Sequence, residues 1–468
     1  MSADGLTVVG GSCSDTGPTF VCQPFKWTTS AINNQQGTMN GLGSLSGYFV
    51  TEASDVSADG SVIVGSACNA TNVQGCQPFR WTAATGLVGL GFNGEGFAVN
   101  AAGNIAVGAI MDSSGDETDA YLWTGGAAQS LTTRLTAHGI DLSGWVLTAA
   151  TGISADGHMV VGRGTLNGNP ALWSVHLPGS HDFDGSGKSD VLWRDSGGDL
   201  AMWFMSGNQI AASSVIGSVA TNWSVVGQRD FNADGDADIL WRDNLGNLDL
   251  WLMHGESLAG TANLGNVPTN WSVYGTGDLN GDGNSDILWR DGNSGAVAIW
   301  LMNGTQVSSV ANLGTVPLTW TIVGDDDKGN VFWRDSGGNV AIWQVNGSRV
   351  VNSVLLGNVP TNWVIAGLGD FDGNGATDIL WRDSSSGAVA IWFMNGTQVQ
   401  SVASVATVTS DWSIAQTGDY DGDGMSDVFW VNSSGQVAVW FMRGGRVASV
   451  ASLGSVGTSW LVQAQNAE

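Results

Sequence analysis

Basic side chains are scarce in this chain: 15 Lys and Arg residues stand against 42 Asp and Glu residues, for a formal net charge of −27. A surface of this charge repels nucleic acids and anionic membranes, so neither is expected as the main partner. Long apolar runs are lacking too; no stretch is long enough to span a membrane, and no secretory signal peptide is visible. The opening MSADGLTVVG matches the middle of later repeats, so we expect the natural N-terminus, with any signal, to lie upstream.

Cysteine is limited to four residues in two similar segments, GSCSDTGPTFVCQPFKW and GSACNATNVQGCQPFRW. A zinc site needs closely spaced Cys or His ligands, and the sequence contains no CxxC motif. Two short loops of matched design instead predict the disulfides Cys13–Cys22 and Cys68–Cys76. Disulfides indicate an oxidising environment, so we expect a secreted or cell-surface protein.

Proline is rare, at 8 residues, whereas glycine (69) and tryptophan (23) are abundant among the 468 residues. This much glycine is typical of disordered linkers or of turn-rich all-β proteins. Regular apolar strands between the glycines favour the all-β class. The length allows two or three domains.

A unit of about 48 residues recurs six times in residues 179–468. Each unit reads as four short strands, with an acidic loop before DILWRD and a tight turn such as Asn303-Gly304 between the third and fourth strands. Four-stranded antiparallel units of this period are propeller blades. The first unit lacks its first strand, and the final GTSWLVQAQ supplies one more, which predicts a closed six-bladed β-propeller.

Residues 1–178 carry a different repeat, SADGxxVVG followed by PFRWT and GLVGLG. Its spacing is also blade-sized, but its ends do not complement each other, so we expect a partial or second β-propeller. We expect the segment SVHLPGS, residues 174–180, to be the linker between the two domains. The four glycine-ended strands end at Gly10, Gly65, Gly108 and Gly162, and the aromatic strands that follow contain Trp27, Trp81, Trp123 and Trp173.

Three tryptophans recur at fixed places in each C-terminal unit. In AVAIWLM both alternating faces are apolar, as in a strand buried on two sides, so this tryptophan is expected to pack between blades. The alternative is an exposed ring that stacks on sugars. The Arg–Asp step of WRD recurs in five of six units, and each residue is expected to pair with a neighbouring strand or blade. The alternative for the arginine is an anionic sugar.

The stretch DFDGSGKSD opens the first C-terminal unit and returns with changes in four others. Positions 1, 3, 5 and 9 carry Asp, Asn or Ser, and position 6 is always Gly. Oxygens from these four side chains, with the main-chain carbonyl of position 7, can assemble a calcium shell. Position 12 is tryptophan rather than the glutamate of an EF-hand, and magnesium suits a flexible loop poorly. A simple turn is the alternative for any one loop, but five matching copies favour about five Ca²⁺ ions.

The expected ligands fall into five sets, one per loop, and position 7 contributes its carbonyl whatever its side chain. They are Asp182, Asp184, Ser186, Lys188 and Asp190; Asp230, Asn232, Asp234, Asp236 and Asp238; Asp278, Asn280, Asp282, Asn284 and Asp286; Asp370, Asp372, Asn374, Ala376 and Asp378; and Asp419, Asp421, Asp423, Met425 and Asp427. The fourth unit, GDDDKGNVFW, is three residues shorter and lacks this spacing, so no metal is expected there.

These five loops, each followed by an apolar strand, make residues 182–468 resemble FG-GAP/VCBS-type repeats. Such repeats are the calcium-loop blades of integrin α-subunits, fungal propeller lectins and many secreted bacterial proteins. The resemblance implies a calcium-binding propeller and assigns the side-chain ligands to positions 1, 3, 5 and 9. Residues 1–178 resemble the bacterial extracellular HAF repeat through VSADGSVIVG and QPFRWTAATGLVGLG.

No catalytic constellation is visible, so we expect no enzyme: a GxSxG elbow and the SxDxGxTW box are missing. The five histidines are scattered at His138, His158, His176, His181 and His254. Repeated blades offer weak sites that gain from multivalency, which favours a binding or adhesion module for glycans or surface proteins. A structural segment of a larger surface protein is the second hypothesis, and a glycan hydrolase or lyase is the third.

Overall fold

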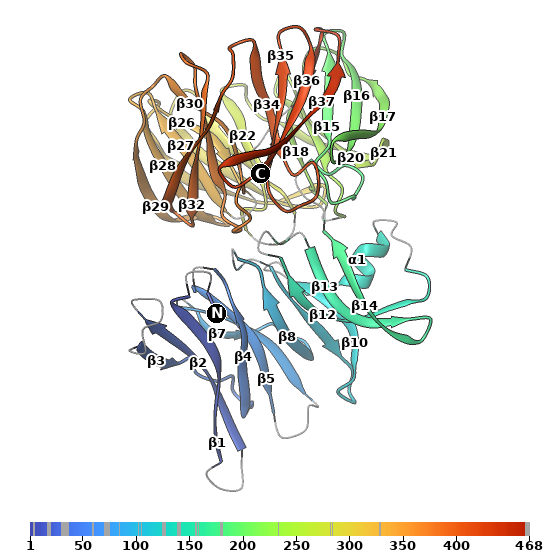
Figure 1. The fold of residues 1–468 in the computed structure, drawn as a ribbon, viewed down its shortest axis with the longest axis vertical. Helices are drawn as coiled ribbons and strands as arrows, with labels where there is room; N and C mark the ends of the chain where they lie inside the picture. Colours follow the sequence, from blue (N-terminus) through green and yellow to red (C-terminus); the bar gives the residue numbers. More distant parts are fainter. Residues whose placement is uncertain are drawn as a thin grey trace. The chain divides into compact units, whose positions relative to one another are not determined.

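The computed structural model describes residues 1–463 except 3–4, 16–19, 30–36, 59, 70–74, 84, 102, 104, 124–127, 138–141, 155–156, 158, 178–180, 233, 281, 283 and 327–328. The chain forms two compact units, Met1–Leu177 and Pro178–Glu468 (Figure 1). The described regular structure is almost entirely β-strand, which confirms the predicted all-β class. Within the described residues, no helix is long and apolar enough to cross a membrane.

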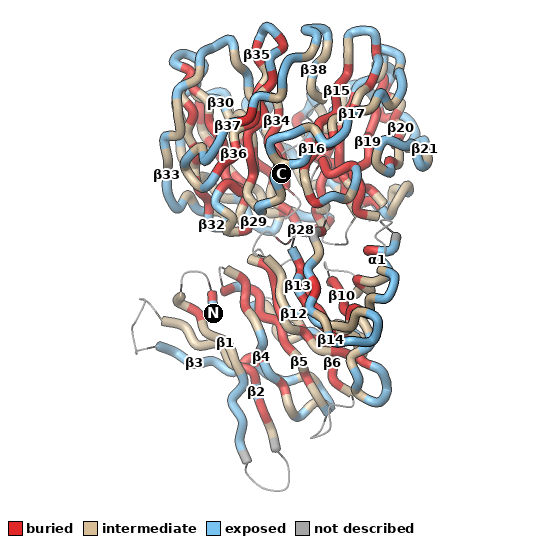
Figure 2. The backbone as a smooth tube through the Cα atoms, turned by 45° about the vertical axis from the view of Figure 1, so that its right-hand side comes forward, coloured by how far each residue is buried: buried red, intermediate tan, exposed pale blue. Residues whose placement is uncertain are grey.

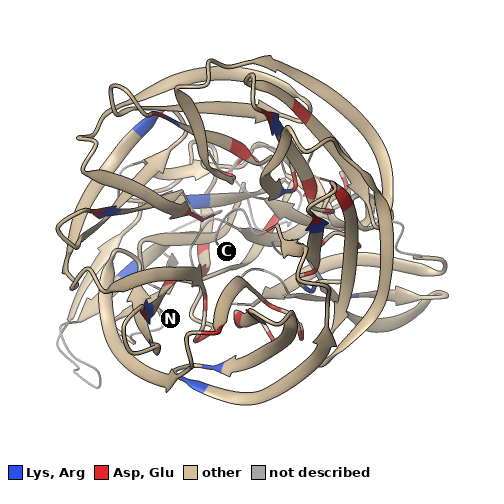
Figure 3. Cartoon of the chain, turned by 90° about the horizontal axis from the view of Figure 1, so that it is seen from above, with Lys and Arg blue, Asp and Glu red and all other residues tan. Residues whose placement is uncertain are grey.

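The C-terminal unit consists of four-stranded antiparallel sheets, which we call blades 1 to 6 in chain order. Seen from above, the sheets surround a common axis (Figure 3). Blade 1 contains β15 (Val191–Asp195), β16 (Asp199–Ser206), β17 (Gln209–Ser218) and β38 (Trp460–Val462). Blade 2 contains β18 (Trp223–Arg229), β19 (Asp238–Asp243), β20 (Asn247–His254) and β21 (Ser257–Asn266). Blade 3 contains β22 (Trp271–Gly277), β23 (Asp286–Asp291), β24 (Ala296–Asn303) and β25 (Gln306–Thr315).

The remaining blades repeat this order. Blade 4 contains β26 (Trp320–Asp325), β27 (Asn330–Asp335), β28 (Asn339–Asn346) and β29 (Arg349–Asn358). Blade 5 contains β30 (Trp363–Gly369), β31 (Asp378–Asp383), β32 (Ala388–Asn395) and β33 (Gln398–Thr407). Blade 6 contains β34 (Trp412–Gly418), β35 (Asp427–Asn432), β36 (Gln436–Arg443) and β37 (Arg446–Ser455). The tight turn before each fourth strand has a glycine with positive φ, such as Gly304 at 60° and Gly396 at 57°.

Blade 1 is assembled from both ends of the C-terminal unit. Strand β38 pairs antiparallel with β15, so that Trp193 lies opposite Val462 and Asp195 opposite Trp460. The amide of Gln463 extends this pairing by donating to the carbonyl of Leu192 at 2.8 Å. The predicted closing strand and the predicted six blades are therefore confirmed.

Neighbouring blades enclose apolar cores that are built around tryptophan. The core that contains Trp241 of blade 2 also contains Leu192 and Met202 of blade 1. The core of Trp193 likewise contains Phe429 of blade 6, which closes the ring. Each WRD tryptophan packs against the third-strand tryptophan of its own blade, with ring centroids 4.7 to 5.3 Å apart. The five WRD tryptophans and the equivalent Trp430 of blade 6 are only 1–2% exposed: Trp193, Trp241, Trp289, Trp333, Trp381 and Trp430.

The third-strand tryptophans are half-buried and belong to the edges of these inter-blade cores. Packing between blades, rather than an open stacking surface, is thus their role as predicted. Exposure is concentrated on the outermost strands, such as β17, β21 and β33 (Figure 2).

The WRD arginine fastens each blade to the next one. Arg242 donates to the carbonyls of Trp271, Val267 and Pro268 in the connection to blade 3. Its guanidinium lies 5.2 Å from the centre of the Trp289 ring, within the range of a cation–π interaction. Four further arginines lie over the next blade's tryptophan in the same way: Arg194, Arg290, Arg334 and Arg382. The predicted structural pairing with a neighbouring blade is confirmed for these arginines.

The aspartate of WRD serves its own blade instead. Asp243 accepts hydrogen bonds from the amides of Leu245 (2.9 Å) and Asn247 (2.8 Å), which shapes the turn between the second and third strands. These bonds, together with the Asn247 side chain, hold the pKa of Asp243 below its ordinary value, although burial acts in the opposite direction.

In the N-terminal unit, the described residues form three sheets and one short helix. The first sheet contains β1 (Thr7–Asp15), β2 (Phe20–Thr29), β3 (Gly37–Gly41), β4 (Val50–Val56), β5 (Val62–Cys68), β6 (Cys76–Thr82) and β7 (Gly86–Gly89). The second contains β8 (Gly94–Val99), β9 (Ala106–Met111), β10 (Glu117–Trp123) and β11 (Gln129–Ser130). Helix α1 (Leu131–Ala137) precedes the third, which contains β12 (Trp145–Ile153), β13 (Met159–Leu166) and β14 (Asn169–His176).

The repeated glycines of this unit make room for aromatic rings. Gly108 lies opposite Tyr121 and Gly162 opposite Trp173 in neighbouring strands. A Cβ atom on Gly162 would lie 2.1 Å from the Trp173 ring, so no other residue fits there without a shift. Trp173 thus takes the place that Tyr121 has in the preceding sheet, and the four predicted aromatic strands do contain Trp27, Trp81, Trp123 and Trp173.

Two further predictions concern this unit. Both predicted disulfides, Cys13–Cys22 and Cys68–Cys76, are present, and each joins residues that face each other across two paired strands. The predicted linker at residues 174–180 is partly wrong, because residues 174–176 belong to β14 and pair with β13. Residues 178–180 lie outside the described residues.

Replacing Arg242 with alanine should loosen the contact between blades 2 and 3. The variant loses charged hydrogen bonds to main-chain carbonyls as well as the contact with Trp289, so we expect a loss of about 2 kcal/mol in the free energy of unfolding. Denaturant titration followed by tryptophan fluorescence measures this loss. The control Arg349→Ala changes an exposed arginine of β29 and should have little effect; equal stability of the two variants would contradict this account.

Candidate metal-binding loops

The five acidic loops all precede the second strand of a blade. Residues 230–238, 278–286, 370–378 and 419–427 connect the first and second strands of blades 2, 3, 5 and 6, and residues 182–190 lead into β15. The side chain at position 2 anchors each loop in the blade, because it is at most 2% exposed. These anchors are Phe183, Phe231, Leu279, Phe371 and Tyr420.

The aspartate at position 1 organises the turn of the loop. In the first loop, Asp182 accepts hydrogen bonds from the amides of Ser186 at 3.0 Å and Gly187 at 2.7 Å. In the last loop, Asp419 accepts the matching bond from Gly424 at 2.8 Å. The position-6 glycine has a positive φ, 78° at Gly187 and 83° at Gly424, a conformation that glycine adopts most readily.

The aspartate at position 9 ties the loop to the rest of the blade. Asp190 accepts one hydrogen bond from the Phe183 amide (2.9 Å) and another from the Met205 amide in the third strand (3.0 Å). The same pair of amide donors recurs in the other loops at Asp238, Asp286, Asp378 and Asp427. All five of these carboxylates are fully buried. The sequence predicted them only as ligands, because a bond to a main-chain amide does not depend on the residue type of the donor.

Carboxylates from positions 1, 3 and 9 converge in three of the loops. In each of these loops, one ligand atom per residue lies within 4.8 Å of the others. The groups are Asp182, Asp184 and Asp190; Asp370, Asp372 and Asp378; and Asp419, Asp421 and Asp427. These clusters bring together the predicted carboxylate ligands of blades 1, 5 and 6.

In blades 2 and 3 position 3 is asparagine, and it is joined to position 5. Asn232 donates to a carboxylate oxygen of Asp234 at 2.9 Å, and Asn280 donates to Asp282 at 3.0 Å. At position 5 of the other loops, Ser186 is exposed, and Asn374 donates to the Met394 carbonyl at 3.0 Å. The loops thus share one backbone frame but differ in how their position-3 and position-5 oxygens are engaged.

Burial opposes ionisation of the position-9 carboxylates. Burial and repulsion from Asp230 and Asp234 raise the pKa of Asp238 to about 9, against the lowering effect of its two amide donors. Burial similarly raises the pKa of Asp378 and Asp427 to about 9. Several carboxyl groups thus share a space of low polarity, and a divalent cation among them would favour their ionised forms.

Hydrogen bonds link each loop to the loop of the following blade. The carbonyl of the position-1 aspartate accepts the amide of position 8 in the next loop, as from Ala237 to Asp182 at 2.7 Å. The same bond joins Ser285 to Asp230, Ser426 to Asp370 and Ser189 to Asp419, at 2.7 to 2.9 Å. The loops of blades 5, 6, 1, 2 and 3 therefore form one continuous series.

Blade 4 has a different loop. Both oxygens of Asp326 accept hydrogen bonds from Asn330, at 2.8 Å from its amide and 2.9 Å from its side chain. The Val345 amide, which corresponds to the Met205 amide, donates to the Gly329 carbonyl at 2.7 Å. A main-chain carbonyl thus replaces the position-9 carboxylate, and the absence of a metal from this loop stays a prediction.

The main-chain carbonyls of position 7 also stay a prediction as ligands. The side chains at this position lie over the position-4 glycine of the preceding loop. Lys188 packs against Gly422 with its Cε 3.5 Å from a Cβ built there, and the Cγ of Met425 lies 3.3 Å from the same point on Gly373. In these two loops the position-7 side chain thus contacts the preceding loop, whereas Asn284 donates to Asp282 of its own loop at 3.1 Å.

The two histidines of the C-terminal unit that the structure describes have different surroundings. His181 is fully buried at the start of the first loop, and burial together with the charge of Arg229 lowers its pKa to about 3. His254 lies at the end of β20, next to Asp236. His138 and His158 lie outside the described residues, and His176 belongs to β14 in the other unit.

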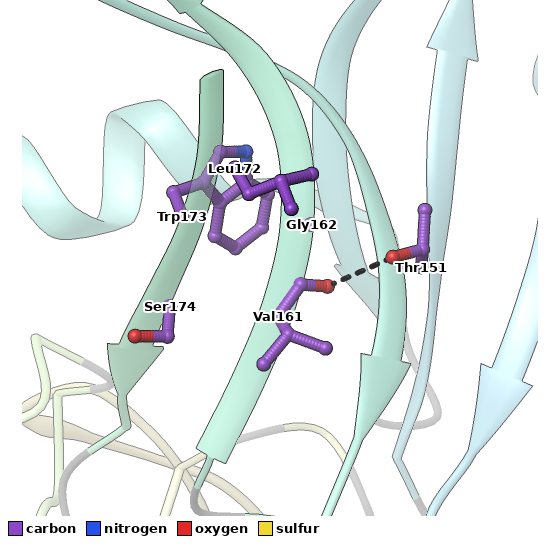
Figure 4. A pocket seen from close by; sticks show the side chains of 6 residues that line it. All are labelled: Thr151, Val161, Gly162, Leu172, Trp173 and Ser174. Atoms are coloured by element: carbon purple, nitrogen blue, oxygen red, sulfur yellow. Dashed lines mark hydrogen bonds between the residues drawn. The ribbon is translucent and has the colours of Figure 1, made fainter.

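Two surface pockets differ in polarity. One of about 390 Å³ lies beside the paired strands β13 and β14, lined by Thr151, Val161, Gly162, Leu172, Trp173 and Ser174 (Figure 4). None of these lining residues is ionisable. The other, of about 270 Å³, lies between blades 2 and 3 and is polar, lined by Asn222, Ser224, Val226, Arg242, Asp243, Asn244 and Thr269.

Three segments match the family of the FG-GAP-like repeat: residues 182–241, 230–289 and 370–430. Each segment runs from the first aspartate of an acidic loop to the WRD tryptophan of the next blade. The C-terminal unit contains FG-GAP-like repeats. These FG-GAP-like repeats carry both the loop and the strands on which it rests, whereas the HAF-type resemblance of residues 1–178 stays a prediction.

Two solved structures share low similarity with the chain. The computationally designed Ika8 protein is 12% identical, with a TM-score of 0.33, and the match covers 60% of this chain and 91% of Ika8. Raptor from Chaetomium thermophilum is 12% identical, with a TM-score of 0.36, over 57% of this chain and 23% of Raptor. No curated protein matches the sequence.

Two substitutions in the last loop should separate metal binding from folding. Asp427→Asn disturbs a buried carboxylate that accepts two amides, so in chelator we expect a loss of about 1–3 kcal/mol in the free energy of unfolding. Asp421→Asn changes an exposed carboxylate and should leave the stability in chelator unchanged while reducing the stabilisation by calcium. Thermal melts with calcium and with EDTA measure both effects; identical behaviour of the two variants would contradict the division of roles.

Proposed function

We propose that this protein is a calcium-stabilised β-propeller that acts outside the cell as a binding or adhesion module. The observation that carries the proposal is the convergence of position-1, -3 and -9 carboxylates within 4.8 Å of one another in blades 1, 5 and 6. In blades 2 and 3 the same main-chain amides donate to the loop aspartates, so we extend the proposal from three loops to five.

The donor set of these loops suits calcium. All the expected ligands are carboxylate, amide, hydroxyl or carbonyl oxygens, which hard cations prefer. An extracellular site with a dissociation constant of ~0.1 mM in ~1 mM calcium contributes about 1.4 kcal/mol. Five such sites together contribute about 7 kcal/mol, comparable with the net stability of a whole domain. Because neighbouring loops are hydrogen-bonded, each ion would also stabilise the junction between two blades.

An extracellular location is compatible with the two disulfides and with the absence of a membrane-crossing helix among the described residues. Free calcium is abundant outside cells, so weak sites would be filled there. We therefore propose that the protein is secreted or displayed on a cell surface.

We propose the polar pocket between blades 2 and 3 as the place where a partner binds. Its lining offers hydroxyl, amide and carboxylate groups, which hydrogen-bond well to sugars or to polar protein surfaces. Arg242 is already engaged by main-chain carbonyls, so it shapes the pocket more than it attracts an anion. Related residues recur in other blades, as in the pairs Asn222 and Asn270 or Ser224 and Ser272. Repeated weak sites of this kind gain strength through multivalency.

A structural role within a larger surface protein is the second candidate. The tryptophan cores and the arginine contacts hold neighbouring blades together, and both recur with little variation. We do not propose an enzyme, because the repeated arrangement needs no unique acid, base or nucleophile.

A glycan array probed with the full chain tests the binding role. We expect sugar binding in 1 mM calcium that weakens in EDTA, because loss of the ions loosens the blade junctions that frame the pocket. The control is Ser224→Ala with Asn222→Ala, which alters the pocket and leaves the loops intact.

A melting temperature that falls in EDTA, with no glycan bound in either condition, would favour the structural role. A melting temperature that is the same with calcium and with EDTA would contradict the calcium proposal itself.

A further inference from the structure

The junction between blades 1 and 2 breaks the symmetry of the acidic loops. Position 7 carries lysine at Lys188 and methionine at Met425, and both lie over a glycine of the preceding loop. At the junction of blades 1 and 2 this position is Asp236, whose Oδ1 lies 3.1 Å from a Cβ built on Gly185. An additional carboxylate is therefore directed at the first loop, beside Asp184.

The Asp236 carboxylate is buried but only partly satisfied. Its side chain is 2% exposed, and its Oδ2 lies 2.6 Å from Nδ1 of His254. Its Oδ1 has no hydrogen-bond partner among the described residues. A buried charged oxygen without a partner costs several kcal/mol, so such an atom points to a ligand.

His254 supplies a ligand of a different kind at the same place. It ends β20, and the next residue, Gly255, donates to the Phe183 carbonyl of the first loop at 2.8 Å, which fixes this turn against blade 1. The imidazole is 58% exposed, so it is accessible to ions in solution. The corresponding residues of the other blades are not histidine: Ser206, Asn303, Asn346, Asn395 and Arg443.

We propose that Asp236 and His254 bind Zn²⁺, or a similar first-row divalent cation, between blades 1 and 2. A nitrogen ligand beside a carboxylate suits these metals, whereas calcium prefers oxygen ligands alone. Water completes the coordination. The side chains of Asp236 and His254 are not among the expected calcium ligands, because Asp236 contributes only its main-chain carbonyl to the second loop.

Calorimetric titration of the untagged full chain with ZnCl₂, in saturating calcium, tests this proposal. We expect the native protein to bind one Zn²⁺ that calcium does not displace. His254→Ala and Asp236→Asn should each weaken this binding by about tenfold or more. Asn395→Ala changes the corresponding exposed turn residue of blade 5 and should bind zinc like the native protein.

The outcomes separate cleanly. The melting temperatures in calcium should be equal for all four proteins, which shows that the blades remain folded. Equal zinc affinity of the native protein and His254→Ala would overturn the proposal, as would zinc that calcium fully displaces. A failure of the calcium loops themselves would appear as unchanged melting in EDTA and would leave the comparison of these variants valid.

Discussion

The buried aspartate at position 9 is the interaction on which the C-terminal unit depends most. Its two oxygens hold amides from two different parts of a blade, the start of the acidic loop and the third strand, as Asp190 does with Phe183 and Met205. This single carboxylate places the loop against the sheet, and it also brings negative charge into a buried space. The raised pKa of Asp238, Asp378 and Asp427 reflects the free-energy cost of ionising these carboxyl groups in that buried space. A cation in the loop would remove the cost and leave the two amide bonds in place.

Contacts between blades follow from the same repeat. Every junction between blades contains an apolar core with a buried tryptophan. In five blades an arginine also reaches the main-chain carbonyls of the next blade. Hydrogen bonds also join the loops of neighbouring blades through residues such as Asp182. An ion bound in one loop would therefore also stabilise the junction with the next blade. Blade 4 lacks the loop, yet its Arg334 and Trp333 keep the other two contacts. The ring therefore tolerates the loss of one loop because the tryptophan and arginine contacts do not depend on it.

Periodicity made the large features predictable from the sequence. The six blades, the closing strand at Trp460 and the two disulfides follow from spacing, because each requires only that equivalent residues occupy equivalent places. Spacing does not identify partners across blades, so the carbonyls that receive Arg242 were not predictable. Nor does it identify the main-chain donor within a blade, such as the Met205 amide that binds Asp190. The contact between Asp236 and His254 was not predicted either, because it occurs at one blade junction only and is not repeated. In the N-terminal unit, the sequence placed Trp173 in an aromatic strand but did not show that its ring lies opposite Gly162.

Crystals of the full chain grown in calcium chloride allow the central claim to be measured directly, through anomalous diffraction at long wavelength. The account predicts five anomalous peaks, one within each of residues 182–190, 230–238, 278–286, 370–378 and 419–427, and none beside Asp326. It would be contradicted by loops that hold no ion while their aspartates turn outward into solvent.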